Sequence, residues 1–276
     1  MIVETHIHSI PRRRLGDSLF RKLCALFPEG EYNGFFSAKF RLDDPHLAKA
    51  RDIIKRGGME PLRSRFQPSA DFEYVEQWVR VYDESDLERA DYLIPSPRKY
   101  AVGLHQLWPE PARLVEGHIA HRVRMVGGTD RSVIAVMDEL KEQMNAAGLR
   151  HLVFLPVEIN EAKAWTIDPY WQIFSDYILP PLSPRCVLKK NGGAVFDGDY
   201  RNGCFVEDGL YSDPELHYTR ESADKFEPFD IALTQERFGN GDRVCYPELV
   251  VSKRFYEFCK KKKLKMDWTP VRIDAE

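Results

Sequence analysis

The sequence predicts an α+β fold in which mixed or antiparallel sheets combine with a few helices. Amphipathic helical segments and β-branched or aromatic runs both recur along the 276 residues, but they neither alternate regularly nor separate into two blocks. With 43% hydrophobic and 12% aromatic residues, the chain can bury a substantial core. Pro95 and Pro97 punctuate it, so we expect an N-terminal α+β subdomain over residues 1–97 and a C-terminal α+β subdomain over 98–276.

The N-terminal part opens with a strand and then an amphipathic helix. A second helix has clearer boundaries: Asp43 or Asp44 can cap it, Pro45 suits its first turn, and two glycines after residue 56 end it. Aromatic and β-branched residues then predict another strand. The expected ranges are a strand over 1–10, helices over about 15–26 and 45–56, an extended segment at "NGFFSAKF", a strand over 72–82 and a short helix from Ser85.

The C-terminal part contains helices and strands in irregular order. Apolar residues at helical spacing predict a helix over 132–147 that ends at Gly148. "HLVFLPVEI" reads as a buried strand, and its Pro156 indicates an edge or a bulge. "PFDIALTQERFG" predicts a strand, followed by a helix over 252–262 and a last strand over 266–273.

The composition argues against several classes of function. A net charge of −3 and a pI near 6.3 disfavour a dedicated nucleic-acid-binding protein, although a local basic patch stays open. Five widely spaced cysteines without a CxxC indicate reduced thiols rather than disulfides or a zinc site. The N-terminus lacks the order of a signal peptide, and no apolar run approaches the roughly 20 residues that span a bilayer. We therefore expect a cytoplasmic protein that contacts neither membrane nor nucleic acid.

The lysine-rich stretch "FCKKKKLKMDW" at 258–268 is the most conspicuous local feature. Phe255, Phe258 and Cys259 have the spacing of one inward helix face, and the lysines follow in the last turn. Cations are favoured at that position by the helix dipole and by unpaired carbonyl groups. We interpret the lysines as a helix terminus and its turn, and a nucleic-acid or membrane arm is the alternative.

His6 and His8 form the first candidate metal site. Two histidines spaced by two residues project to the same face of a strand, as chelation of one ion requires. The same arrangement opens the metal site of amidohydrolase barrels, which need further ligands at later strand ends. Those ligands are not evident here, so a metal-dependent hydrolase is only the alternative function. His118 and His121 likewise lack a third ligand.

Other catalytic motifs are absent from the sequence. The glycines of "KKNGGAVFDGDYRNG" match neither phosphate-binding pattern and are better explained as hairpin turns. No GxSxG elbow occurs, and no serine or cysteine has a recognisable nucleophile context. We therefore expect a protein that is not an enzyme and needs no cofactor.

Two acidic tracts are more distinctive than any catalytic motif. Residues 71–91 contain eight acids against two arginines, and residues 197–230 contain ten acids against three basic residues. Such tracts are ordinarily solvated faces, but they also suit docking of a basic protein, with aromatic residues as anchors. The candidate partner-binding residues are Asp83, Glu84, Asp86, Glu88, Asp91, Asp199, Tyr200, Glu207, Asp208, Tyr211, Asp213 and Glu215.

The C-terminal segment "FDIALTQERFGNGDRVCYPELVVSKRFYEFCKKKKLKMDWTPVRI" resembles the end of a group of predicted bacterial immunity proteins of polymorphic toxin systems. The group includes the double-CXXCG motif proteins. The similar features are "LVVS" leading into "RFYEF", the lysine-rich turn and a last strand closing with "PVR"; "YDESDLERADYL" at 82–93 is similar to an earlier element of the same group.

This resemblance implies a role rather than a catalytic site. Such proteins protect the producing cell and its kin by binding a cognate secreted toxin. The chain departs from the double-CXXCG proteins because it has no CxxC, so no metal is implied. The leading hypothesis is therefore an immunity protein whose partner is a protein toxin, with its oligomeric state open.

Overall fold

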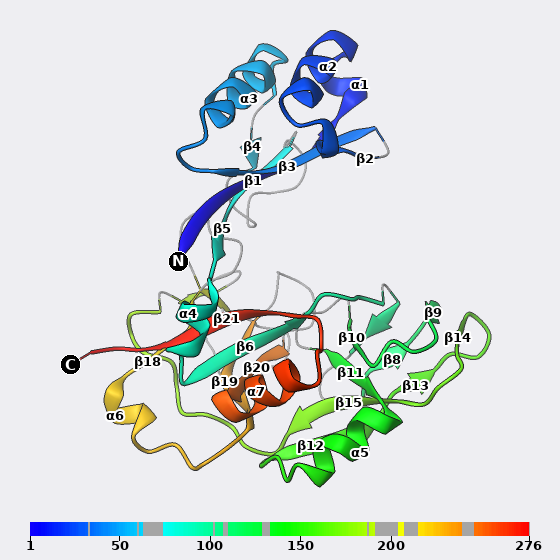
Figure 1. Ribbon diagram of the computed structural model, residues 1–276, viewed down its shortest axis with the longest axis vertical. Coiled ribbons are helices and arrows are strands. Elements are labelled where there is room, and N and C mark those ends of the chain that lie inside the picture. Colours follow the sequence, from blue (N-terminus) through cyan, green and yellow to red (C-terminus); the bar gives the residue numbers. More distant parts are fainter. Residues whose placement is uncertain are drawn as a thin grey trace. The chain divides into compact units, whose positions relative to one another are not determined.

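The computed structural model describes residues 1–32, 34–59, 61–62, 74–101, 103–106, 110–128, 133–186, 188–190, 204–206, 215–238 and 246–275. Contacts divide this part of the chain into two compact units (Figure 1), an N-terminal unit of Met1–Asp83 and a C-terminal unit from Glu84 onward. Both combine helices with strands, which confirms the α+β class.

The division between the units lies at residue 83, whereas the prolines predicted it at 97. The reason is β6 (Tyr92–Pro97), which belongs to the main sheet of the C-terminal unit. Its pairing with β20 (Tyr246–Ser252) covers only Tyr92 and Leu93. Pro95 and Pro97 lie beyond that pairing, where β6 is paired only with β21 (Met266–Ile273), so the strand tolerates both prolines.

The N-terminal unit is built on a five-stranded sheet with the order β2-β3-β1-β5-β4. The central strand β1 (Ile2–Pro11) is antiparallel to β3 (Phe35–Arg41) and to β5 (Tyr74–Val81). Two short strands complete the sheet, β2 (Glu31–Tyr32) beside β3 and β4 (Pro61–Leu62) parallel to β5.

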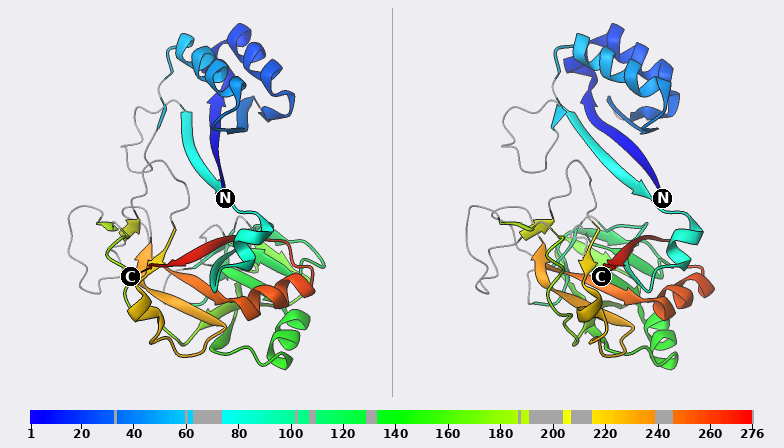
Figure 2. Two further views of the ribbon diagram at one scale, coloured as in Figure 1. Left: turned by 60° about the vertical axis from the view of Figure 1, so that its left-hand side comes forward. Right: turned by 90° about the vertical axis from the view of Figure 1, so that its left-hand side faces the viewer.

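Helices cover one face of this sheet (Figure 2). They are α1 (Arg12–Leu15), α2 (Asp17–Leu26) and α3 (Pro45–Arg56), with a 3-10 turn at Pro28–Gly30. Every second residue of β3 is buried beneath them, namely Phe36, Ala38 and Phe40. Because successive side chains of a strand point to opposite faces of its sheet, these three residues mark the face that packs against the helices. The predicted start of α3 is confirmed: Asp44 accepts a hydrogen bond from the His46 amide at 2.7 Å, and Pro45 occupies the first turn.

The C-terminal unit contains a curled seven-stranded sheet with the order β16-β17-β19-β20-β6-β21-β18. The strands β20 and β21 come from the end of the chain and flank β6 from its beginning. The other members of this sheet are β16 (Leu188–Lys190), β17 (Cys204–Val206), β18 (His217–Tyr218) and β19 (Ile231–Phe238).

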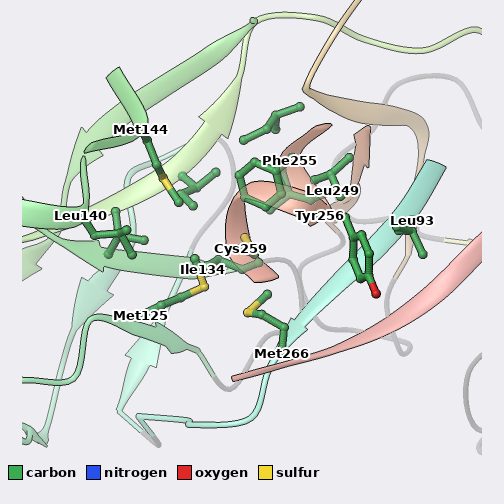
Figure 3. Packing of buried hydrophobic residues seen from close by; sticks show 14 of the residues in the cluster. Leu93, Met125, Ile134, Leu140, Met144, Leu249, Phe255, Tyr256, Cys259 and Met266 are labelled. Carbon is green, nitrogen blue, oxygen red and sulfur yellow. The ribbon is translucent and has the colours of Figure 1, made fainter. Parts of the chain in front are cut away.

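A four-stranded antiparallel sheet with the order β10-β11-β15-β12 forms the second layer of this unit. Side chains from both sheets and from two helices share one core, in which Phe255 and Cys259 of α7 lie toward Leu140 and Met144 of α5 and Tyr256 lies toward Leu93 of β6 (Figure 3). The elements of this layer are β10 (Met125–Gly127), β11 (Ile134–Met137), α5 (Asp138–Ala146), β12 (Leu152–Pro156), β15 (Tyr170–Ser175) and α7 (Lys253–Lys261).

The remaining elements of the unit are short. They are α4 (Glu84–Glu88), β7 (Leu104–His105), β8 (Arg113–Leu114), β9 (Gly117–Ile119), β13 (Glu158–Ile159), β14 (Ala164–Thr166) and α6 (Arg220–Ala223). The strands β13, β8 and β7 form one small sheet, and β9 pairs with β14 in parallel.

The helix predicted over 132–147 is correct only in its second half. The structure has a strand, β11, before the helix α5 begins at Asp138. Val133, Ile134, Ala135 and Val136 are all buried, and continuous burial is typical of a central strand rather than of a one-sided helix. The acidic pair Asp138 and Glu139 instead occupies the first helical turn, where the dipole favours negative charge.

The lysine-rich stretch is a helix terminus and turn, as predicted. Ser252 caps α7 by accepting a hydrogen bond from the Phe255 amide at 3.3 Å. The helix ends at Lys261, and Lys263 adopts a left-handed conformation with φ of 54° before β21 begins. The Nζ atom of Lys260 bonds to Glu84 of α4, so part of this positive charge is neutralised within the fold.

Candidate protein-binding surface

The acidic residues of the first tract lie on and around α4, where they form ion pairs inside the C-terminal unit. Lys260 pairs with Glu84 and lies 3.5 Å from Glu88. The hydrogen bond and charge of Lys260 lower the pKa of Glu84. Asp86 pairs with Arg89 at 3.0 Å. These contacts attach α4 to α7, so this part of the tract has a structural role whether or not it also binds a partner.

Asp83 and Asp91, the other predicted residues of this tract, are also exposed. The Asp91 carbonyl oxygen accepts a hydrogen bond from the Lys253 amide at 3.1 Å, which fixes the backbone there while its carboxylate faces solvent. Glu76, from the same tract, is buried in the N-terminal unit and accepts a hydrogen bond from Arg51 Nε at 3.0 Å. The tract is therefore not one continuous solvated face.

Most of the residues predicted in the second tract lie outside the described residues, namely Asp199, Tyr200, Glu207, Asp208, Tyr211 and Asp213. Of the predicted residues in this tract, the structure describes Glu215, which is paired with Arg272 of β21 at 2.8 Å. Asp230 at the end of the tract is buried. Glu215 and Asp230 thus contribute to the packing of the unit, whereas the other described acids of the tract, Glu221, Asp224 and Glu227, are exposed.

Asp230 belongs to a hollow of about 410 Å³ that is also lined by Gly148, Arg150, Phe229 and Arg254. Its carboxylate accepts hydrogen bonds from Arg254 Nη1 at 2.7 Å, from Ser252 Oγ at 2.7 Å and from the Arg150 amide at 2.8 Å. Because the charged groups of this hollow satisfy one another, it is better explained as a structural junction than as a ligand site.

His6 and His8 project from β1 on the sheet face opposite Thr5 and Ile7, which are buried under the helices. Their ring centroids are 4.6 Å apart, and His6 Nε2 lies 3.0 Å from Ser37 Oγ. Burial, followed by the charges of His8 and Lys39, lowers the pKa of His6 to about 4. Within the described residues, no group of three histidine, cysteine, aspartate or glutamate side chains is arranged to hold a metal ion.

The larger hollow of the C-terminal unit is a cleft of about 810 Å³ beside the β9–β14 pair. In the parallel register of this pair, Trp165 lies opposite His118. Their rings stack with centroids 5.0 Å apart and planes at 7° to each other. The described lining of the cleft consists of Tyr100, Ala101, Gly103, Glu116, Gly117, His118 and Lys163.

Two glycines allow the backbone to form this cleft. A Cβ atom on Gly103 would lie 2.0 Å from the Glu116 carbonyl oxygen, so a side chain there would force the two segments apart. Gly117 has a φ of +79°, which residues with a side chain rarely adopt. Its amide donates to the Lys163 carbonyl oxygen at 3.0 Å and holds β9 against the segment that leads into β14.

Three large exposed side chains are associated with this lining: Tyr100 is part of it, Trp165 stacks on its His118, and Ile167 follows Trp165 by two residues. Tyr100 and Trp165 are each 54% exposed, and Ile167 is 63% exposed. The Tyr100 hydroxyl forms a hydrogen bond with Ser96 Oγ at 2.8 Å, which restricts its ring. Exposed aromatic anchors next to a hollow with both charges, here Glu116 and Lys163, are typical of protein-binding surfaces. We call Tyr100, His118, Trp165 and Ile167 the aromatic rim.

The sequence did not predict the aromatic rim. His118 was considered with His121, but the two diverge: His118 stacks on Trp165, whereas His121 Nδ1 lies 3.2 Å from Asp168. The signal that could have found the rim is "AWTID", in which two large apolar residues, Trp165 and Ile167, flank Thr166 at the end of a short strand. Its pairing with His118 comes from tertiary structure.

Among the described residues, no helix is both long enough and apolar enough to cross a bilayer. Comparisons with protein-family models, with curated proteins and with solved structures give no match to this chain.

Proposed function

We propose that this chain is a cytoplasmic immunity protein that binds a cognate secreted bacterial toxin and neutralises it by direct protein–protein contact. The observation that carries this proposal is the aromatic rim, because Trp and Tyr held in place around a hollow supply most of the binding energy in protein interfaces. The resemblance of residues 229–273 to immunity proteins supplies the class of partner.

The position of that C-terminal segment agrees with a structural rather than a catalytic motif. It provides β19, β20, α7 and β21, which form much of the main sheet and core of the C-terminal unit. Such a segment would be shared among proteins that have a common scaffold but bind different toxins. The partner-specific contacts are then made by surface residues such as those of the aromatic rim.

The test uses the product of the adjacent reading frame if it carries a toxin-like C-terminal domain. Co-expression should restore growth of cells that produce this domain, and the two proteins should copurify. A combined rim variant, Tyr100→Ala/Trp165→Ala/Ile167→Ala, should weaken the complex. Ile178→Ala is the matched control, because Ile178 is 61% exposed against 63% for Ile167 but does not belong to the rim.

Loss of binding at least tenfold for the combined rim variant, with an unchanged control, is the result we expect, since hot-spot truncations each cost about 2 kcal/mol or more. Full protection by the rim variant would show that the toxin binds elsewhere. Failure of the intact protein to copurify with or protect against any adjacent product would refute the immunity function itself.

A metal-dependent hydrolase remains the second candidate, favoured by the contact between the His6 and His8 rings on one face of β1. At neutral pH an imidazole with a pKa near 4 is uncharged, as a metal ligand must be. Elemental analysis of the purified protein decides this point: stoichiometric zinc, manganese or iron that is lost in a His6→Ala/His8→Ala variant would support it, and its absence would end it.

A further inference from the structure

The helical layer of the N-terminal unit carries a concentration of positive charge that the net charge of the chain conceals. The helices α1, α2 and α3 together contain nine arginine and lysine side chains against two aspartates. All three helices cover the same face of the sheet (Figure 2), and their apolar residues are buried against it. Most of the basic side chains are exposed, although Arg51 of α3 reaches the buried Glu76 of β5.

Close packing brings the basic ends of two helices together. A Cβ atom on Gly57, directly after α3, would lie 2.4 Å from Leu15 Cδ1 at the end of α1, so the two segments are in close contact there. The exposed Arg13 of α1 is thereby placed at the same end of the layer as Lys55 and Arg56 of α3. The neighbouring helix α2 adds Arg21 and Lys22, both exposed.

The acidic residues of these helices do not neutralise the layer. Asp17 is paired with Arg12 at 2.8 Å, and Asp52 is paired with Arg56 at 2.6 Å. Arg51 is engaged with the buried Glu76. Four exposed cations, Arg21, Lys22, Lys49 and Lys55, form no ion pair with any described residue.

We propose that this basic layer, defined as the exposed arginines and lysines of α1, α2 and α3, binds the phosphodiester backbone of a nucleic acid. Several unpaired cations on one surface release condensed counterions from such a backbone, and this release drives binding without sequence preference. The inference is separate from the proposed immunity function, which rests on the other unit.

An acidic protein is the less suitable occupant. Among the described residues of the N-terminal unit, the exposed large apolar side chains lie outside the three helices, namely Met1, Ile2, Phe35, Leu42 and Val81. Protein interfaces need such anchors at their centre, whereas phosphate contacts need only arginine and lysine. The layer also lacks exposed aromatic rings on which bases could stack, so we expect contacts to the backbone and not to the bases.

The test is fluorescence anisotropy of the full chain with a labelled DNA duplex and a labelled single-stranded RNA, each of about 20 nucleotides. Affinity should fall by about a hundredfold between about 50 and about 200 mM salt if four phosphates are contacted. The variant Arg21→Gln/Lys22→Gln/Lys49→Gln/Lys55→Gln should lose at least about tenfold in affinity at low salt, and its salt slope should decrease by about one for each contact removed.

The matched control removes four lysines from the C-terminal turn, as Lys261→Gln/Lys262→Gln/Lys263→Gln/Lys265→Gln. It has the same net charge as the test variant and should bind like the intact protein. Circular dichroism checks folding, and the pairs Arg21→Gln/Lys22→Gln and Lys49→Gln/Lys55→Gln replace the fourfold variant if it unfolds. Absence of binding at low salt, an equal loss in both fourfold variants, or equally effective competition by polyglutamate would each overturn the proposal.

Discussion

Arg254 of α7 donates a hydrogen bond to the buried carboxylate of Asp230 at 2.7 Å and also to the carbonyl oxygens of Ala147 and Gly148. One guanidinium therefore joins the start of α7, the start of β19 and the end of α5. The carbonyl groups it reaches are among those that the end of a helix leaves unsatisfied.

The variant Asp230→Ala should lower the free energy of unfolding by about 2–4 kcal/mol, because it leaves the Arg150 amide, the Ser252 hydroxyl and Arg254 without their shared acceptor. Urea denaturation measures this change. Asp267→Ala is the control: its ion pair with Arg98 is exposed on both sides, so its loss should cost less than about 1 kcal/mol. Equal effects would contradict the structural role of Asp230.

Phe255 is fully buried in the core shared by the two larger sheets of the C-terminal unit. Phe255→Ala should therefore destabilise the protein by about 3–5 kcal/mol through lost burial and the cavity that remains. Phe35→Ala removes the same atoms from an exposed position in the N-terminal unit and should change stability by less than about 0.5 kcal/mol. Thermal and chemical denaturation of the two variants provide the comparison.

The pKa of His6 predicts an acid-sensitive stability. Since the folded-state pKa is about 4 and the ordinary value is 6.5, the unfolded chain binds a proton on His6 between these values and the folded chain does not. The free energy of unfolding should fall as the pH decreases from 6.5 towards 4, and His6 should contribute no pH dependence above this window. The ring is only part-buried, so its share stays well below the roughly 3 kcal/mol that the shift alone would represent.

Denaturation of the intact protein and of His6→Gln at several pH values measures this contribution, and the variant should show a shallower loss on acidification. An NMR titration of the His6 ring with a midpoint near 6.5 would contradict the prediction.

For the proposed binding of a toxin, the acidic tracts predict that association depends on salt. Like charges gathered on one protein accelerate encounter with an oppositely charged partner, and dissolved ions screen this attraction. The association rate should fall at least about tenfold from low to physiological salt, and Asp91→Asn should lower it at low salt. Glu161→Gln, an exposed acid outside the tracts, is the control for loss of one charge. A rate that does not change with salt would remove the electrostatic part of the proposal.

Local chemistry made several elements predictable from the sequence. Asp44, Pro45 and Gly57 define α3 because each acts within a single turn, and the same holds for Ser252 at the start of α7. The strand β11 was missed because Val133, Val136 and Met137 also fit a helical spacing, and only burial on all sides separates the two interpretations. The aromatic rim was missed for a different reason: His118 and Trp165 are distant in sequence and meet only through the β9–β14 pairing.

The place of β6 between β20 and β21 has a consequence for synthesis of the chain. The described elements of the N-terminal unit have all left the ribosome once Val81 has emerged, so this unit can fold early. The strand β6 follows directly, yet both of its partners are translated last. Until they arrive, its backbone groups stay unpaired and open to association with other nascent chains. The sheet of the larger unit can therefore close around β6 only when the end of the chain has been made.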